Sequence, residues 1–153
     1  MKPIKLFFSY SHKDEALREE LVKHLAGLKR SGVLETWDDR NIDAGDEWAA
    51  SIDQHINSAH IILLLISPDF IASTYCYEVE MKRAMERHES RDAVVIPVIL
   101  RPCDWNNLPF SGLQALPLNA DPVVSAKWSY PDEAFANIAL GIRKVAEKLR
   151  SSV

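Results

Sequence analysis

Short apolar runs alternate with amphipathic stretches along this chain of 153 residues. The clearest run, residues 61–66, consists of isoleucine and leucine alone, which is typical of a strand buried on both faces of a parallel sheet. Similar runs predict strands over residues 4–10, 33–37 and 93–100, with room for a further short strand near Val123 and Val124. Pro97 has no N–H to donate, so the strand over residues 93–100 should lie at or near an edge of the sheet.

Apolar residues at helical spacing occupy the stretches between these strands. They predict helices over about residues 13–30 and 132–150, a helix that begins at Trp48, and a helix that begins after Ser73 or Thr74. Ser11 should cap the first of them, because Ser11-His12-Lys13-Asp14 resembles a capping box. Strands that alternate with helices indicate a parallel sheet covered by helices on both faces. We therefore predict one α/β domain over residues 1–153, flavodoxin-like, with a five-stranded, mainly parallel sheet in the order 2-1-3-4-5.

The helix after Ser73 carries two carboxylates near its start, Glu78 and Glu80. It begins at the carboxyl edge of the predicted sheet, where open α/β folds build ligand sites. The two glutamates flank the predicted core stripe of this helix on opposite sides, so one of them could face a cleft while the other faces water. A second candidate region is the segment 38–47, which is polar and lacks regular apolar spacing. It should form a long connecting loop, and such loops are often functional or mobile.

Composition and charge argue against several classes of function. The net charge of −4 and the lack of a long basic stretch argue against direct binding of nucleic acid, and the apolar runs are too short to span a membrane. The two cysteines suggest no disulfide framework, which fits a reducing, cytoplasmic environment. The five histidines show no metal spacing with cysteine, and the two common phosphate-binding motifs are missing, so no metal or cofactor is expected.

Three segments of the chain match motifs of one known family, in the order in which that family carries them. They are Phe7-Phe8-Ser9-Tyr10-Ser11-His12-Lys13-Asp14, then Trp37-Asp38-Asp39 through Ile42-Asp43-Ala44-Gly45-Asp46-Glu47-Trp48, then Leu65-Ile66-Ser67-Pro68-Asp69-Phe70 through Ser73-Thr74-Tyr75-Cys76 and Glu80-Met81. In that order they resemble the first box, the second-box or BB loop, and the S-x-W-C-x-x-E-L stretch of the Toll/interleukin-1 receptor (TIR) domain family. The resemblance covers about residues 3–149, and the chain looks like the bacterial NAD⁺-cleaving type.

Two positions depart from the family pattern. Ala44 stands where the family often has proline, and Tyr75 stands where many members have tryptophan. The step from Tyr75 to the glutamate is also one residue longer than usual, so the catalytic register could fall on Glu78 or on Glu80. Glu80 fits better, because an apolar residue and then small residues follow it, as they follow the family's glutamate.

The resemblance implies two classes of function. Many bacterial and plant TIR domains cleave NAD⁺ at the nicotinamide–ribose bond, and some cyclise the remaining ADP-ribose, whereas animal receptor and adaptor TIR domains act as assembly modules. This chain is therefore expected to be an NAD⁺ hydrolase or cyclase of bacterial immune signalling, activated by self-association with other TIR domains through the 38–47 loop. The alternative is a non-enzymatic TIR–TIR adaptor. The sequence leaves open whether the product is linear or cyclic and whether the chain is a fragment of a longer protein.

The resemblance also assigns roles to individual residues. Glu80 would be catalytic, although from its place alone it could be a carboxylate on a helix surface. The residues expected to line the substrate site are Tyr10, Ser11, Trp37, Asp43, Gly45, Cys76 and Trp105. Some of them also have a purely structural explanation, with Ser11 as a helix cap, Trp37 in the core and Gly45 supplying a positive φ. Cys76 in particular could be a buried, inert thiol.

Overall fold

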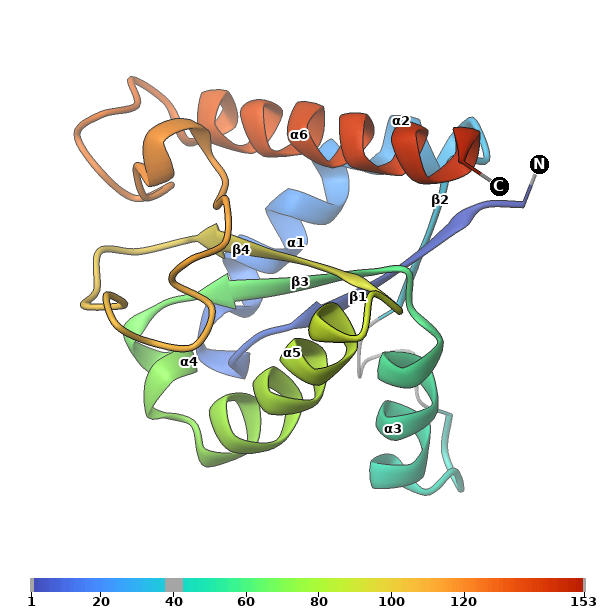
Figure 1. The fold of residues 1–153 in the computed structure, drawn as a ribbon. Coiled ribbons are helices and arrows are strands. Elements are labelled where there is room, and N and C mark those ends of the chain that lie inside the picture. The colour runs from blue at the N-terminus through green and yellow to red at the C-terminus, as the bar shows by residue number, and fades with distance from the viewer. Residues whose placement is uncertain (1, 38–42, 153) are drawn as a thin grey trace.

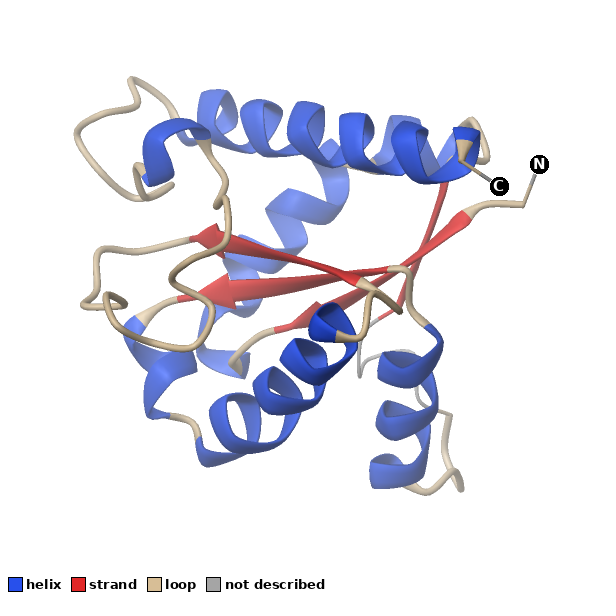
Figure 2. Ribbon diagram, in the orientation of Figure 1, coloured by secondary structure: helices blue, strands red, loops and turns tan. Residues whose placement is uncertain are grey.

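Four parallel strands form the centre of the molecule in this computed structural model, which describes residues 2–37 and 43–152. The strands are β1 (Ile4–Ser9), β2 (Leu34–Trp37), β3 (Ile61–Ile66) and β4 (Val94–Ile99). They pair in the order β2-β1-β3-β4, with every pair parallel. The arrows of β1, β3 and β4 in Figures 1 and 2 consequently point the same way. Because every pair is parallel, the carboxyl ends of all four strands lie at one edge of the sheet.

Helices cover both faces of this sheet (Figure 1). One face carries α1 (Glu15–His24), α2 (Ala26–Arg30) and α6 (Pro131–Ser151), which pack on the sheet through residues such as Leu21, Phe135 and Ile138. The other face carries α3 (Trp48–Ser58), α4 (Pro68–Ala72), the π-helix η3 (Tyr75–Met81) and α5 (Lys82–Glu89). Two short 3₁₀ helices, η1 (His12–Asp14) and η4 (Leu118–Ala120), complete the regular structure of the described residues. The layers confirm the predicted flavodoxin-like α/β fold.

The predicted fifth strand does not form within the described residues. Val123 and Val124, where it was predicted, contact the end of β4 through hydrogen bonds from their N–H groups to the carbonyls of Ile99 and Leu100. An isolated bridge joins Leu116, earlier in the chain, to Val98. Pro117 and Pro122 lie between Leu116 and Val123 and limit the pairing, since proline cannot donate to a ladder. The strand β4 is therefore an edge strand, as Pro97 predicted.

Two predicted helices differ in detail from the structure. The helix expected over residues 13–30 is divided into η1, α1 and α2, with an interruption at Leu25. This interruption lies close to Gly27, and glycine is among the weakest helix formers. The short helix α4 was not predicted, although Ser67 caps it by accepting from the N–H of Phe70 at 3.0 Å, and Pro68 occupies its first turn.

Candidate functional site

A cleft of about 450 Å³ opens at the carboxyl end of β1, which is a usual size for a pocket that binds a small molecule. Its walls come from the segment after β1, from the first residue of α3, and from η3 with the residues before it. The lining residues are Tyr10, Ser11, His12, Lys13, Trp48, Ser73, Tyr75, Cys76 and Glu80. The structure thus brings together four of the predicted site residues: Tyr10, Ser11, Cys76 and Glu80.

Glu80 is a buried carboxylate in the wall of this cleft. It is 6% exposed, whereas Glu78, two residues earlier on the same helix, is exposed to solvent. The hydroxyl of Ser9, which is fully buried at the end of β1, donates to Oε1 of Glu80 at 2.8 Å. This hydrogen bond ties the helix to the sheet and restricts how the carboxylate can turn. One of the two glutamates therefore faces the cleft and the other faces water, as the sequence suggested.

The π-helix η3 explains the unusual spacing between Tyr75 and Glu80. In a π-helix each N–H bonds to the carbonyl five residues back, so such a segment holds one residue more than an α-helix of the same path. Both ends of η3 are held in place: Ser73 Oγ accepts from the N–H of Cys76 at 3.1 Å, and Met81 is fully buried in the core. The additional residue is accommodated between them, and Glu80 remains in the cleft. Such π-helical turns are frequently found at functional sites.

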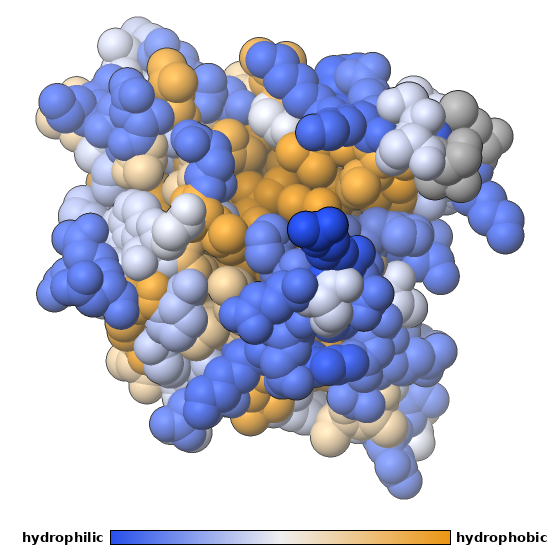
Figure 3. Space-filling view, viewed as in Figure 1, coloured by the Kyte–Doolittle hydropathy of each residue, from blue (hydrophilic) through white to orange (hydrophobic). Residues whose placement is uncertain are grey.

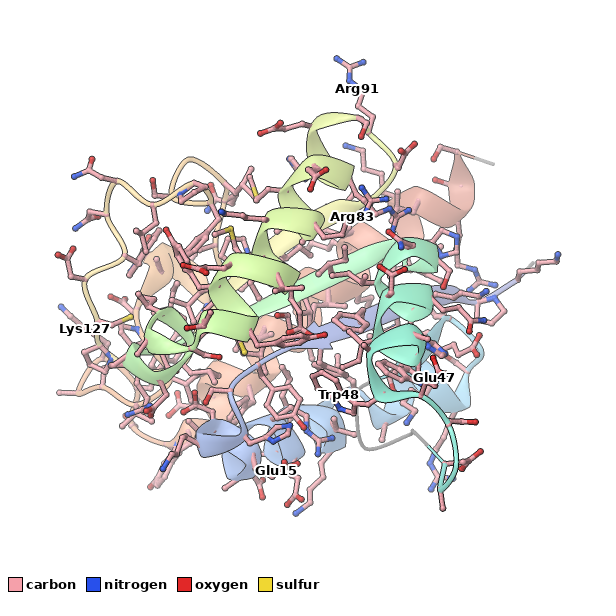
Figure 4. The ribbon with its side chains drawn as sticks, turned by 90° about the horizontal axis from the view of Figure 1, so that it is seen from below. Glu15, Glu47, Trp48, Arg83, Arg91 and Lys127 are labelled. Carbon is pink, nitrogen blue, oxygen red and sulfur yellow. The ribbon has the colours of Figure 1, made fainter. Side chains whose placement is uncertain are left out.

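Aromatic rings form much of the remaining wall. The rings of Trp48 and Tyr75 lie 4.7 Å apart at an angle of 48°, and the ring of Tyr10 lies 5.7 Å from His12. Trp48 is 44% exposed, and in Figure 4 it lies at the start of α3, on the side toward α1, which carries Glu15. The role of Trp48 was missed from the sequence, although its place directly after the long polar loop was the available signal. Flat, exposed rings next to a carboxylate suit a planar, cationic ligand.

A buried ionic network fixes the wall formed by residues 11–13. Asp14 is 3% exposed, accepts from the hydroxyl of Ser67, and accepts from Nε of Arg101 at 3.0 Å. Arg101 also donates to Asp69, at the start of α4. Burial alone would lower the pKa of Arg101, but the carboxylates of Asp14 and Asp69 outweigh it and raise that pKa. The ends of β1, β3 and β4 are thereby linked behind the cleft.

Three of the predicted site residues at the cleft also have structural roles. Ser11 Oγ accepts from the N–H of Lys13 at 3.2 Å, so its roles as a cap and as a lining residue coexist. Cys76 is 5% exposed, and its thiol donates to the carbonyl of Tyr10 at 3.3 Å. The hydroxyl of Tyr10 donates to the carboxylate of Glu15 at 3.3 to 3.4 Å. The floor of the cleft is therefore held by contacts between β1, α1 and η3.

The other predicted site residues lie outside the cleft lining. Trp37 stacks on Phe7 and on His55, with ring centroids 5.5 and 3.9 Å away, and belongs to the core. Trp105 also packs against that core, in the loop after β4. Asp43 and Gly45 are exposed; the carbonyl of Asp43 accepts from the N–H of Asp46 at 3.1 Å, and Gly45 has a φ of +95°. Residues 38–42 of the predicted loop fall outside the described residues.

Within the described ranges, no group of three or more histidine, cysteine, aspartate or glutamate side chains is arranged to hold a metal ion. None of the described helices has the length and apolar character needed to cross a membrane. Burial raises the pKa of the Cys103 thiol, which keeps that side chain protonated.

The topology and the cleft together define a flavodoxin-like α/β domain with a carboxylate site at the carboxyl edge of its sheet. The family profile described as "TIR domain" matches residues 6–133, so the chain belongs to the TIR domain family. Solved structures share the fold of this chain. The TIR domain of the Toll-related receptor TRR-2 from Hydra magnipapillata superposes with a TM-score of 0.56 at 22% identity, over 72% of this chain and 81% of that chain.

Three further proteins are similar over smaller shares of their own length. The uncharacterized protein y4lF of Sinorhizobium fredii (strain NBRC 101917 / NGR234) is 54% identical over 144 residues, which is 94% of this chain and 44% of that protein. The disease resistance-like protein CSA1 of Arabidopsis thaliana is 33% identical over 86 residues, 56% of this chain and 7% of that protein. The TIR domains of the activated Roq1 resistosome, which directly recognizes the pathogen effector XopQ, superpose with a TM-score of 0.51 at 26% identity, over 62% of this chain and 56% of that chain. The chain thus spans less than half the length of the two curated relatives, y4lF and CSA1.

Proposed function

We propose that this domain cleaves NAD⁺ between nicotinamide and ribose, with Glu80 as the catalytic residue. The observation that carries the proposal is the buried Glu80 carboxylate, held by Ser9 in the wall of an aromatic-lined cleft, while Glu78 faces water. Membership of the TIR domain family supports it, because NAD⁺ cleavage is among the activities that the sequence motifs suggested.

The chemistry requires little from the protein beyond this carboxylate. As the bond between the ribose C1′ and the nicotinamide nitrogen breaks, positive charge develops on the sugar ring, and nicotinamide leaves as a neutral molecule without a general acid. Glu80 stabilises that charge and orients the ribose hydroxyls. Attack by water at C1′ gives ADP-ribose and releases a proton, whereas attack by an adenine nitrogen of the same molecule gives a cyclic isomer.

The cleft supplies the positioning that this reaction needs. Tyr75 and Trp48 offer faces on which a planar base can stack, and the nicotinamide ring is cationic before cleavage. Lys13 lies in the same lining and offers a charge for a phosphate group. The restriction of Glu80 by Ser9 lowers the cost of orienting the carboxylate during the reaction.

The two glutamates on η3 provide the matched test. We expect Glu80→Gln to abolish NAD⁺ cleavage and Glu78→Gln to leave most of it, because only Glu80 lines the cleft. Both variants should be compared at equal fraction folded, with thermal unfolding as the control. An inactive Glu78→Gln variant would assign catalysis to Glu78 instead of Glu80. If purified wild type shows no cleavage at all, the adaptor function becomes the better account.

Self-association through the loop over residues 38–47 is the second part of the proposal, and it would act in cytoplasmic immune signalling. The described part of this loop is exposed and acidic, with Asp43, Asp46 and Glu47 facing solvent and Gly45 at its turn. A head-to-tail contact of this kind is heterologous and builds filaments rather than closed dimers. Specific activity should therefore rise with protein concentration. A flat profile across a hundredfold dilution of an active protein would contradict this part while leaving the catalytic proposal intact.

A further inference from the structure

A second cavity, of about 490 Å³, lies at the opposite, amino edge of the sheet. Its lining residues are Lys2, Pro3, Ile4, Lys5, Glu35, His60 and Arg150. They come from the amino end of the chain, from β1 and β2, from the residue before β3 and from the last turns of α6. Both chain ends lie on this side of the molecule in Figure 1, far along the strands from the carboxyl edge. Nothing in the catalytic proposal uses this cavity.

The charge of the cavity is opposite to that of the whole chain. Three cationic side chains, Lys2, Lys5 and Arg150, meet one carboxylate, Glu35, whereas the chain has a net charge of −4. A concave surface lined by one sign of charge concentrates its field and attracts counter-ions of the other sign. The cavity therefore favours an anion.

Arg150 carries a buried donor that lacks a partner. Its Nε atom is inaccessible to water and makes no hydrogen bond with any residue that the structure describes. A buried donor in this state costs about 1–3 kcal/mol, and proteins rarely leave one unsatisfied. The Arg150 side chain as a whole is only partly buried, so a turn of its guanidinium group would bring Nε and a terminal nitrogen against two oxygens of one bound phosphate, the pair of contacts for which this group is shaped.

His60 adds a neutral donor rather than a further charge. Its Nδ1 accepts from the backbone N–H of Lys5 at 2.9 Å, which assigns the ring proton to Nε2. Burial lowers the pKa of His60, and the nearby cations Lys5 and Arg87 lower it further, so the ring is neutral at pH 7. The cavity thus combines cationic groups with a neutral N–H group, a set that suits phosphate oxygens.

An apolar surface continues from this cavity along α6. A neighbouring cavity of about 360 Å³ shares His60 and is bordered by Val94 and Leu149, which are only partly buried. Figure 3 shows apolar surface in this region, between α6 and the turn from α5 to β4. Two carboxylates, Glu89 and Asp92, and one cation, Arg91, also line the neighbouring cavity, so its charged side chains sum to a negative charge and it suits an uncharged ring better than a phosphate group.

We propose that the amino edge of the sheet binds a phosphorylated small molecule of nucleotide size. Its phosphate groups lie against Arg150, Lys5 and Lys2, and its uncharged part lies toward Val94 and Leu149. The site is separate from the cleft at Glu80, and the proposal does not depend on NAD⁺ cleavage.

Titration of the full chain by NMR tests this site directly, with ADP, inorganic pyrophosphate and adenosine as separate probes at about 150 mM salt. We expect ADP to shift the resonances of His60 and Arg150 in a saturable way and to bind more tightly than pyrophosphate. Adenosine should shift them weakly, because it carries no phosphate. If pyrophosphate binds as tightly as ADP, the site takes phosphate alone, and the inferred ring position near Val94 and Leu149 is wrong.

Substitutions inside and outside the cavity distinguish a specific phosphate site from general attraction between opposite charges. Arg150→Gln should raise the Kd for ADP about tenfold, the effect of losing one charge-assisted hydrogen bond. Lys5→Gln should act in the same direction. Lys148→Gln removes the same charge from an exposed position on the same helix, and it should change Kd by less than about twofold. Equal losses in Arg150→Gln and Lys148→Gln, shifts that do not saturate, or shifts confined to the Glu80 cleft would overturn the proposal.

Discussion

Removal of Glu78 from the chain should convert the π-helix η3 into an α-helix without unfolding the domain. Glu78 is exposed, and the two ends of η3 are held by Ser73 and by the buried Met81. Deletion therefore removes the additional residue while Glu80 keeps its place in front of Ser9. Because the change touches only a solvent-facing position, the free energy of unfolding should change by no more than about 1 kcal/mol.

Deletion of Glu86 is the matched control, since it removes another exposed glutamate from the same helical segment. Glu86 lies in the α-helix α5, which has no additional residue to lose. Its deletion therefore rotates the residues that follow it in α5 by about 100° relative to those before it. Arg87 would then lose its hydrogen bonds to the carbonyls of Ile56, Ala59 and Asp92, at 2.7, 2.6 and 3.0 Å. Bonds from a charged donor contribute about 1.5–3 kcal/mol each, so even partial loss should cost about 3 kcal/mol or more.

Thermal unfolding of the two deletion variants tests the predicted difference in stability, and their NAD⁺ turnover tests whether Glu80 keeps its place. In a domain of this size about 3 kcal/mol corresponds to a fall in Tm of about 6–12 °C, which we expect for the Glu86 deletion and not for the Glu78 deletion. The Glu78 deletion should also retain cleavage, because Glu80 remains. Equal loss of Tm in both variants would refute the inserted-residue explanation. A stable but inactive Glu78 deletion beside an active wild type would refute the assignment of catalysis to Glu80.

Three substitutions extend these tests. Ser9→Ala should lower kcat about tenfold at nearly unchanged KM and lower Tm by about 2–4 °C, because Glu80 loses the buried hydrogen bond that orients it. A rise in KM alone in steady-state kinetics would contradict this. Gly45→Arg should abolish the rise of specific activity with concentration, whereas Gly45→Ala, which shares the backbone strain at φ +95° but adds no bulk, should preserve it. Arg87→Gln should lower the free energy of unfolding in urea by about 2–3 kcal/mol, and a loss below about 0.5 kcal/mol would contradict the role given to its carbonyl contacts.

The strands were the most predictable part of this fold. Residues 61–66 form β3 with the predicted bounds, and the other three strands differ from their predicted ranges by one residue or so at an end. A continuous run of apolar residues indicates a segment that is buried on both faces, so such runs locate the strands of a parallel sheet well. The fifth strand, predicted near Val123 and Val124, did not form: Pro122 directly precedes this short apolar pair, and strand pairing depends on contacts that so short a segment does not encode.

The sequence predicted which carboxylate lies in the cleft, but it did not predict all the residues that form the cleft walls. Glu80 could be placed because the helix period and the motif spacing constrained it together. The π-helix could not be foreseen, since its sequence has no signature beyond one surplus residue. Trp37 was expected to line the substrate site and instead lies in the core, the alternative given for it, where Phe7 and His55 stack on it. Trp48 was expected only to begin a helix, and it also lines the cleft. Contacts between residues far apart in the sequence decide such cases.

The most direct measurement of the central claim is the product profile after incubating the purified domain with NAD⁺ at high protein concentration, beside Glu80→Gln at equal fraction folded. We predict that nicotinamide appears in equal amount to the NAD⁺ consumed, together with ADP-ribose or a cyclic isomer, and that Glu80→Gln produces neither. Nicotinamide release by the wild type that does not exceed release by Glu80→Gln would contradict the claim that this cleft cleaves NAD⁺.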